Sequence, residues 1–92
     1  MIKKFKHKGL KQLFTTGVST GVNPKHVTLL RKITALLETA ETLEDVSLPG
    51  LGLHQLKGRR QETWAVNVSG NWRITFKIQN GDVFDVNYED YH

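Results

Sequence analysis

The sequence predicts a two-layer α+β fold, with two N-terminal helices packed on a C-terminal antiparallel sheet. Two observations lead to this prediction. Apolar residues recur at spacings of three and four in the first half of the chain, which is typical of amphipathic helices. In the second half they alternate with polar residues, which is typical of strands. The 92 residues suffice for one modest core, and we expect residues 1–92 to form one domain.

The first helical pattern lies close to the N-terminus. Residues 2–6 are expected to form a short edge strand, whose lysines would discourage pairing with another sheet. A first helix is expected over about 8–16, and Gly17 supplies its stop signal. The apolar positions of this helix are Leu10, Leu13 and Phe14.

The second helix is expected to be the longest, over about 24–40. Asn23 provides an N-cap, and Pro24 follows where its missing N–H costs nothing. Residues 43–48 are expected to add one more turn before Pro49-Gly50 breaks the chain. The apolar stripe of the helix consists of Val27, Leu30, Ile33, Leu37 and Ala40.

The second half of the chain is expected to form a meander. A short extended segment over 53–56 precedes strands at 64–68, 72–78 and 83–88. Gly70-Asn71 and Asn80-Gly81 mark the turns, and the latter is a strong hairpin signal. Strict alternation places Phe84, Val86 and Tyr88 on the core side, and it places Arg73, Thr75 and Lys77 on the opposite, open face.

Composition limits the classes of function. The formal net charge of +4 favours a polyanionic partner, and RNA, DNA, an acidic protein or no partner all remain open. The absence of cysteine excludes disulfides and thiolate zinc sites. No apolar run is long enough to span a bilayer, and the basic N-terminus lacks the apolar segment of a signal peptide. We therefore expect a cytoplasmic protein that does not bind membranes.

Two basic features could bind phosphate at the open face. The planar guanidinium of Arg73 suits phosphate, although Arg73 could instead be solvated or pair with Glu89 or Asp85. The compact turn Lys57-Gly58-Arg59-Arg60 could hold a nucleic-acid backbone or be an ordinary charged loop. The same alternatives apply to the lysines near the N-terminus, which include Lys3, Lys4 and Lys6.

The histidines His54 and His92 could serve acid–base chemistry, because histidine titrates near neutral pH. Asp90 would raise the pKa of the His92 imidazole. Strand phase places Asp90 and His92 on the core side, where charge is costly. We expect either a bulge near Tyr88-Glu89 or a position beyond the edge of the helix layer. A metal site made of His54, Asp90 and His92 has suitable ligands but no supporting spacing, so no metal or cofactor is predicted.

These motifs resemble those of the HigB, or plasmid-maintenance killer, family of toxins in the RelE/ParE superfamily. The resemblance covers essentially the whole chain, and Gln61-Glu62-Thr63 departs from it in a loop. It rests on Leu53-His54-Gln55-Leu56-Lys57-Gly58-Arg59, Trp64-Ala65-Val66-Asn67-Val68, Asn71-Trp72-Arg73-Ile74-Thr75-Phe76, Gly81-Asp82 and Asp90-Tyr91-His92, and on Ile2-Lys3-Lys4-Phe5, Gly9-Leu10 and Leu13-Phe14 near the N-terminus.

The resemblance implies a toxin of a type II toxin–antitoxin system, which cleaves mRNA on the ribosome without metal and thereby inhibits translation. It also implies a cognate HigA-like helix-turn-helix antitoxin, through which alone operator DNA would be bound. Arg73 and Lys57 would stabilise phosphoryl charge, His54, Asp90 and His92 would share proton transfer, and Tyr91 would position a base or phosphate. RNA contacts would come from Arg59, Arg60, Lys77, Lys3, Lys4 and Lys6.

Two other functions fit the same fold. One is inhibition of DNA gyrase by binding, as in ParE-like proteins, and the terminal Asp90-Tyr91-His92 argues against it. The other is a plain nucleic-acid-binding module that uses the basic loop and the lysines. A fold by itself does not separate these functions from ribonuclease activity.

Overall fold

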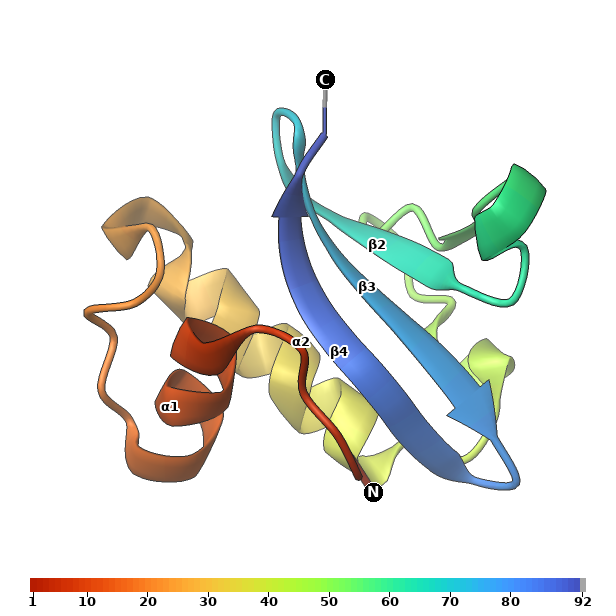
Figure 1. Cartoon of the computed structure of the whole chain (residues 1–92), viewed down its shortest axis with the longest axis horizontal. Coiled ribbons are helices and arrows are strands. Elements are labelled where there is room, and N and C mark those ends of the chain that lie inside the picture. Colours follow the sequence, from red (N-terminus) through yellow and green to blue (C-terminus); the bar gives the residue numbers. More distant parts are fainter. Residues whose placement is uncertain (92) are drawn as a thin grey trace.

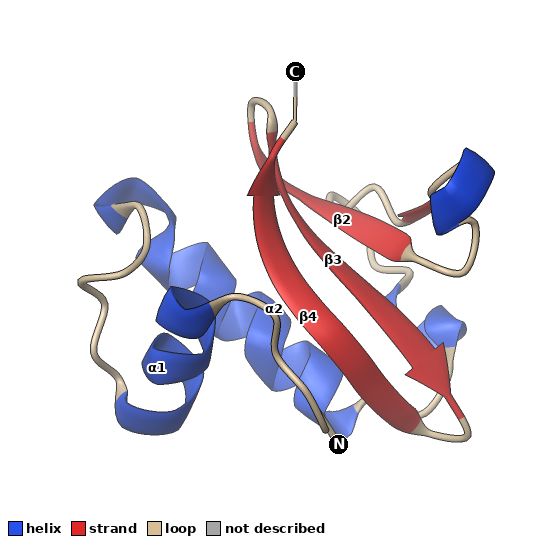
Figure 2. Cartoon of the chain, viewed as in Figure 1, coloured by secondary structure: helices blue, strands red, loops and turns tan. Residues whose placement is uncertain are grey.

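The computed structural model describes residues 1–91 and confirms the predicted α+β layers (Figure 1). The two helices lie to one side of a four-stranded antiparallel sheet of order β1-β2-β3-β4 (Figure 2). The helices are α1 (Lys8–Thr16) and α2 (Val27–Thr39), the strands are β1 (His54–Gln55), β2 (Trp64–Ser69), β3 (Trp72–Gln79) and β4 (Asp82–Asp90), and the 3-10 turns are η1 (Pro24–His26), η2 (Leu43–Val46) and η3 (Gly58–Arg60).

The helix boundaries follow the local signals in the sequence. Helix α1 ends at Gly17, whose φ of 81° is left-handed and whose N–H donates to the Leu13 carbonyl. The Asn23 side chain accepts from the Lys25 N–H, as predicted for a cap. The helix expected over about 24–40 is present in two parts. Its first three residues form the 3-10 turn η1, and α2 begins at Val27.

The N-terminal segment runs along the outer edge of β4, as Figure 1 shows. It pairs in parallel through two isolated bridges, Ile2 with Val83 and Phe5 with Val86. The Lys3 N–H donates to the Val83 carbonyl at 2.7 Å and the Lys6 N–H donates to the Val86 carbonyl at 2.8 Å. The expected edge strand over 2–6 is therefore present as an extended segment with interrupted pairing, and it covers the backbone of β4.

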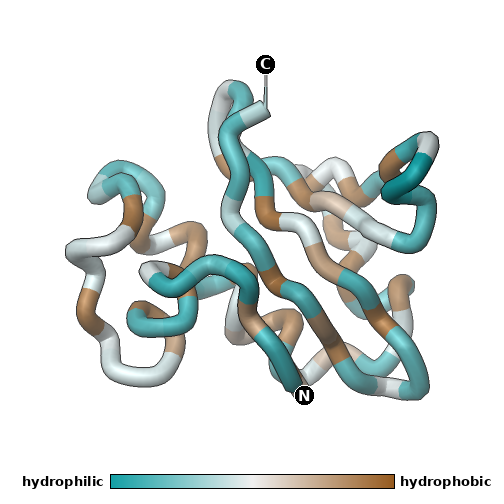
Figure 3. Tube along the Cα trace, viewed as in Figure 1, coloured by the Kyte–Doolittle hydropathy of each residue, from teal (hydrophilic) through white to brown (hydrophobic). Residues whose placement is uncertain are grey.

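The core lies between the helices and one face of the sheet. Val66, Ile74 and Phe76 of β2 and β3 are fully buried against α2, whose Leu30 and Leu37 are also fully buried. The alternation of hydrophobic and hydrophilic residues along the strands is visible in Figure 3. Burial of the apolar face therefore fixes which residues of β2 and β3 point away from the helices.

The predicted phase of β4 is wrong in its first half. Thr75 pairs with Asn87 and Lys77 pairs with Phe84, so two steps on β3 face three on β4. This bulge lies at Asp85, whose φ of 55° is left-handed. The extra residue reverses the alternation, so Val83 is buried and Phe84, expected on the core side, is only half-buried. No bulge separates Tyr88 from Glu89.

Among residues 1–91, no helix is both long and apolar enough to cross a membrane.

Candidate active site

The face of the sheet opposite the helices carries the candidate site. Residues directly opposite one another on neighbouring strands point to the same face. Asn67 of β2 pairs with Arg73 of β3, and Arg73 pairs with Glu89 of β4. Thr75, two residues along β3, shares this face. Register therefore brings Arg73, Thr75 and Glu89 together on the side that the helices leave uncovered.

The Glu89 carboxylate is the centre of a hydrogen-bonded cluster on this face. Arg60 donates two bonds to it, Nη1 to Oε1 at 3.0 Å and Nη2 to Oε2 at 2.6 Å. The Thr75 hydroxyl donates to Oε2 at 2.6 Å, and Arg73 Nη2 donates to Oε1 at 3.4 Å. The hydrogen bonds from Arg60 are the main reason that the pKa of Glu89 falls to about 2. Glu89 is therefore ionised at neutral pH.

Arg73 is held between this carboxylate and an aromatic ring. Its guanidinium carbon lies 4.3 Å from the centre of the Tyr91 ring, at cation–π distance. Only 12% of its side chain is exposed. Within residues 1–91, its buried Nε has no hydrogen-bond partner. Of the alternatives left open by the sequence, pairing with Glu89 is the one found.

The basic turn lies over the same side of the sheet, because Arg60 reaches Glu89 from η3. Gly58 begins η3 with a left-handed φ of 70°, which allows the chain to turn sharply after Lys57. The hydrogen bond to Glu89 raises the pKa of Arg60. Lys57 and Arg59 are exposed. The Arg60–Glu89 pair thus fixes to this face a loop that carries two further exposed cations, Lys57 and Arg59.

His54 occupies the other end of this face. It pairs with Ala65, which pairs with Thr75, so His54 and Thr75 share a face. Two strand spacings separate them, roughly 10 Å between Cα atoms. The His54 Nδ1 lies 2.8 Å from the Gly52 carbonyl oxygen, which can only accept a hydrogen bond. The neutral ring therefore carries its proton on Nδ1, and Nε2 is the basic nitrogen.

The terminal residues Asp90 and Tyr91 are on opposite sides of the sheet. Asp90 pairs with Trp72, on the helix side, and is exposed. It therefore projects beyond the helix layer, which is one of the two expected arrangements. Tyr91 continues the pairing, with its N–H 3.0 Å from the Asn71 carbonyl, and its ring lies on Arg73. His92 lies outside the described residues.

The remaining candidate cations lie along the sheet from this cluster. Lys77 and Lys4 flank the Asp85 carboxylate at 3.8 and 3.9 Å. Lys77 is four residues from Arg73 on β3, roughly 13 Å along the strand. Lys3 and Lys6 are exposed on the N-terminal segment. Cations therefore extend along the open face and the adjacent edge over about two nucleotide lengths.

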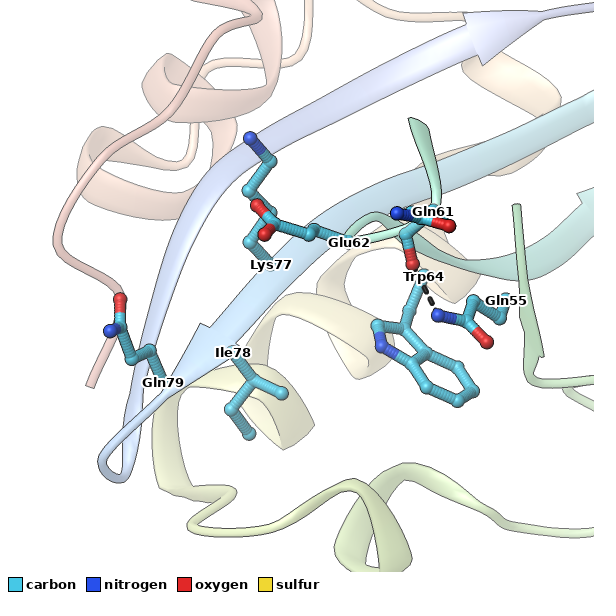
Figure 4. A pocket seen from close by; sticks show the side chains of 7 residues that line it. All are labelled: Gln55, Gln61, Glu62, Trp64, Lys77, Ile78 and Gln79. Carbon is cyan, nitrogen blue, oxygen red and sulfur yellow. Dashed lines mark hydrogen bonds between the residues drawn. The ribbon is translucent and has the colours of Figure 1, made fainter. Parts of the chain in front are cut away.

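A pocket of about 490 Å³ lies at the far end of β3. It is lined by Lys77 and its neighbours on β3, by Gln61 and Glu62 of the β1–β2 connection, and by the strand residues Gln55 and Trp64 that flank this connection (Figure 4). Arg73, His54 and Lys57 do not line it, so the candidate site is an open surface rather than this pocket. No group of three histidine and carboxylate side chains within residues 1–91 is arranged to hold a metal ion. A group that includes His92 lies outside the described residues.

The sequence did not identify Glu89 as a site residue; it named it only as a possible partner of Arg73. The signal that could have found it is register, since the Asn80-Gly81 hairpin aligns β3 with β4. A bulge of one residue inside that hairpin is what places Glu89, rather than Tyr88, beside Arg73.

The chain is similar to known proteins along almost its whole length. The model of a family described as "RelE-like toxin of type II toxin-antitoxin system HigB" matches residues 3–92. The chain is also 46% identical to the Endoribonuclease HigB of Proteus vulgaris over 92 residues, which is the full length of both chains.

Proposed function

This chain belongs to the HigB-like family of RelE-like toxins of type II toxin–antitoxin systems and is an endoribonuclease, and on that premise we propose that it cleaves mRNA on the ribosome without a metal ion. Cleavage of this kind inhibits translation. The observation that carries the proposal is the Arg73 guanidinium, which is held on an open, cation-lined face of the sheet. The whole chain acts as one toxin domain.

The reaction needs a base, an acid and fixed positive charge. A base removes the proton from a 2′-hydroxyl, and the resulting oxygen attacks the adjacent phosphorus. The bond from phosphorus to the 5′-oxygen breaks, and an acid protonates the departing oxygen. Negative charge builds on the phosphoryl oxygens, so a preorganised cation lowers the barrier. Every step uses protein side chains and the RNA itself, and none requires a metal ion.

Arg73 and Lys57 supply the fixed charge in this proposal. Arg73 suits the role because its side chain is largely buried and is held on two sides, which lowers the entropic cost of binding phosphate. Tyr91 lies against Arg73 and can stack on a base or orient the phosphate. The RNA backbone is bound by the exposed cations Arg59, Lys3, Lys4 and Lys6 and by the half-buried Lys77. Arg60 joins them with the donors that Glu89 leaves unoccupied.

Proton transfer is shared by His54, Asp90 and His92. His54 suits the base role, because its hydrogen bond to the Gly52 carbonyl leaves Nε2 as the basic nitrogen. His92 and Asp90 then act on the leaving-group side. Asp90 pairs with Trp72 on the opposite side of the sheet from Arg73, so it acts from the exposed end of β4.

The experiment is primer extension on an mRNA translated in a purified system. Wild-type protein should produce cuts only when ribosomes are present, and treating the toxin alone with EDTA, followed by removal of the chelator before the ribosomes are added, should not lower cleavage. Arg73→Ala should lower cleavage about 100-fold, as expected for loss of a charge-stabilising donor. Arg31→Ala, which removes an arginine from α2 on the helix side, is the matched control.

Undiminished cleavage by a folded Arg73→Ala variant that also lacks His92 would show that the site is wrongly assigned. Cleavage of the same RNA without ribosomes would refute ribosome dependence. Inhibition of gyrase supercoiling by the purified protein would instead support a ParE-like function.

A toxin of this class has a cognate antitoxin, and we propose a HigA-like helix-turn-helix protein for it. The pair, rather than the toxin alone, would then bind operator DNA. Ribosomes and mRNA are the other partners, which places the protein in the cytoplasm. Co-expression of the toxin with the neighbouring reading frame should yield a complex that shifts operator DNA, while the toxin alone should not.

A further inference from the structure

We propose that Glu89 is a positioning residue for RNA cleavage, which holds the Arg73 guanidinium where the scissile phosphate binds and is itself anchored by Arg60 and Thr75. The proposal rests on the proposed function, because it assigns Arg73 to the phosphate. It adds to the site a carboxylate that neither the motifs nor the resemblance singled out.

The hydrogen bonds around Glu89 are directional. Arg60 donates two parallel hydrogen bonds to the Glu89 carboxylate. The hydroxyl of Thr75, on β3, donates a third hydrogen bond to it, with an O–O distance of 2.6 Å. The Asn87 amide lies 3.4 Å from the same oxygen that Thr75 contacts. These donors come from η3, β3 and β4, so the carboxylate cannot rotate without breaking several charge-assisted bonds. A carboxylate fixed in this way is a rigid reference point for Arg73.

Arg73 needs such a reference point because its side chain is long. A free arginine side chain samples many rotamers, and part of this freedom is lost whenever it binds phosphate. Here the Tyr91 ring contacts the face of the guanidinium, and Glu89 accepts from one of its N–H groups at 3.4 Å. The ring restricts tilt and the carboxylate restricts rotation in the plane, so the other donors point in a fixed direction.

A carboxylate in a site that binds a polyanion weakens binding, and the presence of Glu89 there therefore supports a role in positioning Arg73. Glu89 lies beside Arg73 on the face where RNA would bind, and its charge repels phosphate. Arg60 offsets that charge with a bidentate pair. A residue selected only for affinity would not be negative at this position. Its presence is explained if correct placement of Arg73 increases the rate more than the repulsion weakens binding.

This reasoning predicts opposite effects on turnover and on binding. Glu89→Gln keeps the shape of the side chain but removes its charge. The kcat for mRNA cleavage on ribosomes should fall 10- to 100-fold, because misplacement of a catalytic group by about 1 Å can have an effect of that size. The KM should stay the same or fall, since a repulsive charge is gone. The pH–rate profile should keep its shape, because Glu89 transfers no proton.

Control variants separate positioning from charge and from folding. Glu44→Gln removes an exposed carboxylate from η2, outside the cluster around Arg73, so its kcat should stay within about twofold of wild type. Thr75→Val removes one anchor and retains Glu89, and it should lower kcat several-fold. Thr75→Ser keeps the hydroxyl and should restore the rate. These Thr75 variants test the proposal even if Glu89→Gln does not fold.

An NMR measurement tests the same contact without any activity. Arginine Nε–Hε signals should show slow rotation of the Arg73 guanidinium in the free wild-type protein and faster rotation in Glu89→Gln. Equal rotation in both would overturn the proposal. Slow rotation in wild type together with an unchanged kcat in Glu89→Gln would overturn it as well, as would a kcat loss of the same size in Glu44→Gln. A wild-type protein that cuts no mRNA but shows the difference in rotation would refute the proposed function and leave the Glu89–Arg73 constraint supported.

Discussion

The Glu89 cluster should make the stability of this protein depend on acid. The pKa of Glu89 is about 2 in the folded protein, against an ordinary value of 4.5 for a glutamate carboxyl group. A depressed pKa contributes stability that is complete above the unfolded pKa of 4.5 and is lost as the pH falls through the folded pKa of about 2. Linkage between these two values gives a loss of about 2 kcal/mol between pH 7 and pH 3, with the rest lost at still lower pH.

Glu89→Gln isolates this contribution from that of every other carboxylate. Urea unfolding of wild type and Glu89→Gln at pH 7 and pH 3 gives the free energy of unfolding of each. The difference in free energy of unfolding between wild type and Glu89→Gln should be about 2 kcal/mol smaller at pH 3 than at pH 7. The loss should be smaller in 0.5 M salt, because Arg60 is 44% exposed and its attraction to Glu89 is screened.

The control for this experiment is Glu44→Gln, which removes an exposed carboxylate from η2. The difference in free energy of unfolding between wild type and Glu44→Gln should not shrink by about 2 kcal/mol between pH 7 and pH 3. If wild type and Glu89→Gln lose stability in parallel between pH 7 and pH 3, then the hydrogen-bonded cluster does not hold Glu89 in its ionised form.

Three further predictions concern the site and the packing that supports it. Arg73→Lys keeps the charge but loses the planar fork, so primer extension should show cleavage at least 10-fold below wild type; full activity would mean that only charge matters. Gly9→Ala should lower the free energy of unfolding by about 1–3 kcal/mol, since its Cβ would lie 2.9 Å from the Gly21 Cα, and an unchanged urea midpoint would contradict that close approach. Tyr88→Phe removes the hydroxyl that lies 2.5 Å from the buried His26 Nδ1, so thermal unfolding should show a loss of about 1–3 kcal/mol, and a gain in stability would show that His26 needs no partner.

Local signals predicted most elements of the fold. The stripe of α2, the stop at Gly17 and the Asn80-Gly81 hairpin all act over a few residues, so their effects are visible in the sequence. The alternation in β3 was also sufficient to place Arg73 and Thr75 on the open face, since that strand has no interruption between them.

The sequence failed where one residue changed the phase of a strand. The residues around Phe84 and Val86 do not predict the bulge at Asp85. The left-handed φ of this aspartate depends on how β4 pairs with β3 and not on the residue type alone. The expected placement of Phe84 was therefore wrong, and the alternatives for Asp90 could not be separated.

By itself the sequence determined the order of the elements, the apolar faces and the family, and it named residues from several separate segments as candidates. Tertiary structure decided which of them meet. The pairing of Arg73 with Glu89, the reach of Arg60 across the sheet and the Tyr91 ring over Arg73 all join residues at least 16 positions apart, Arg60 and Glu89 by 29. Contacts over such separations depend on strand register and loop closure, which a bulge of one residue can change.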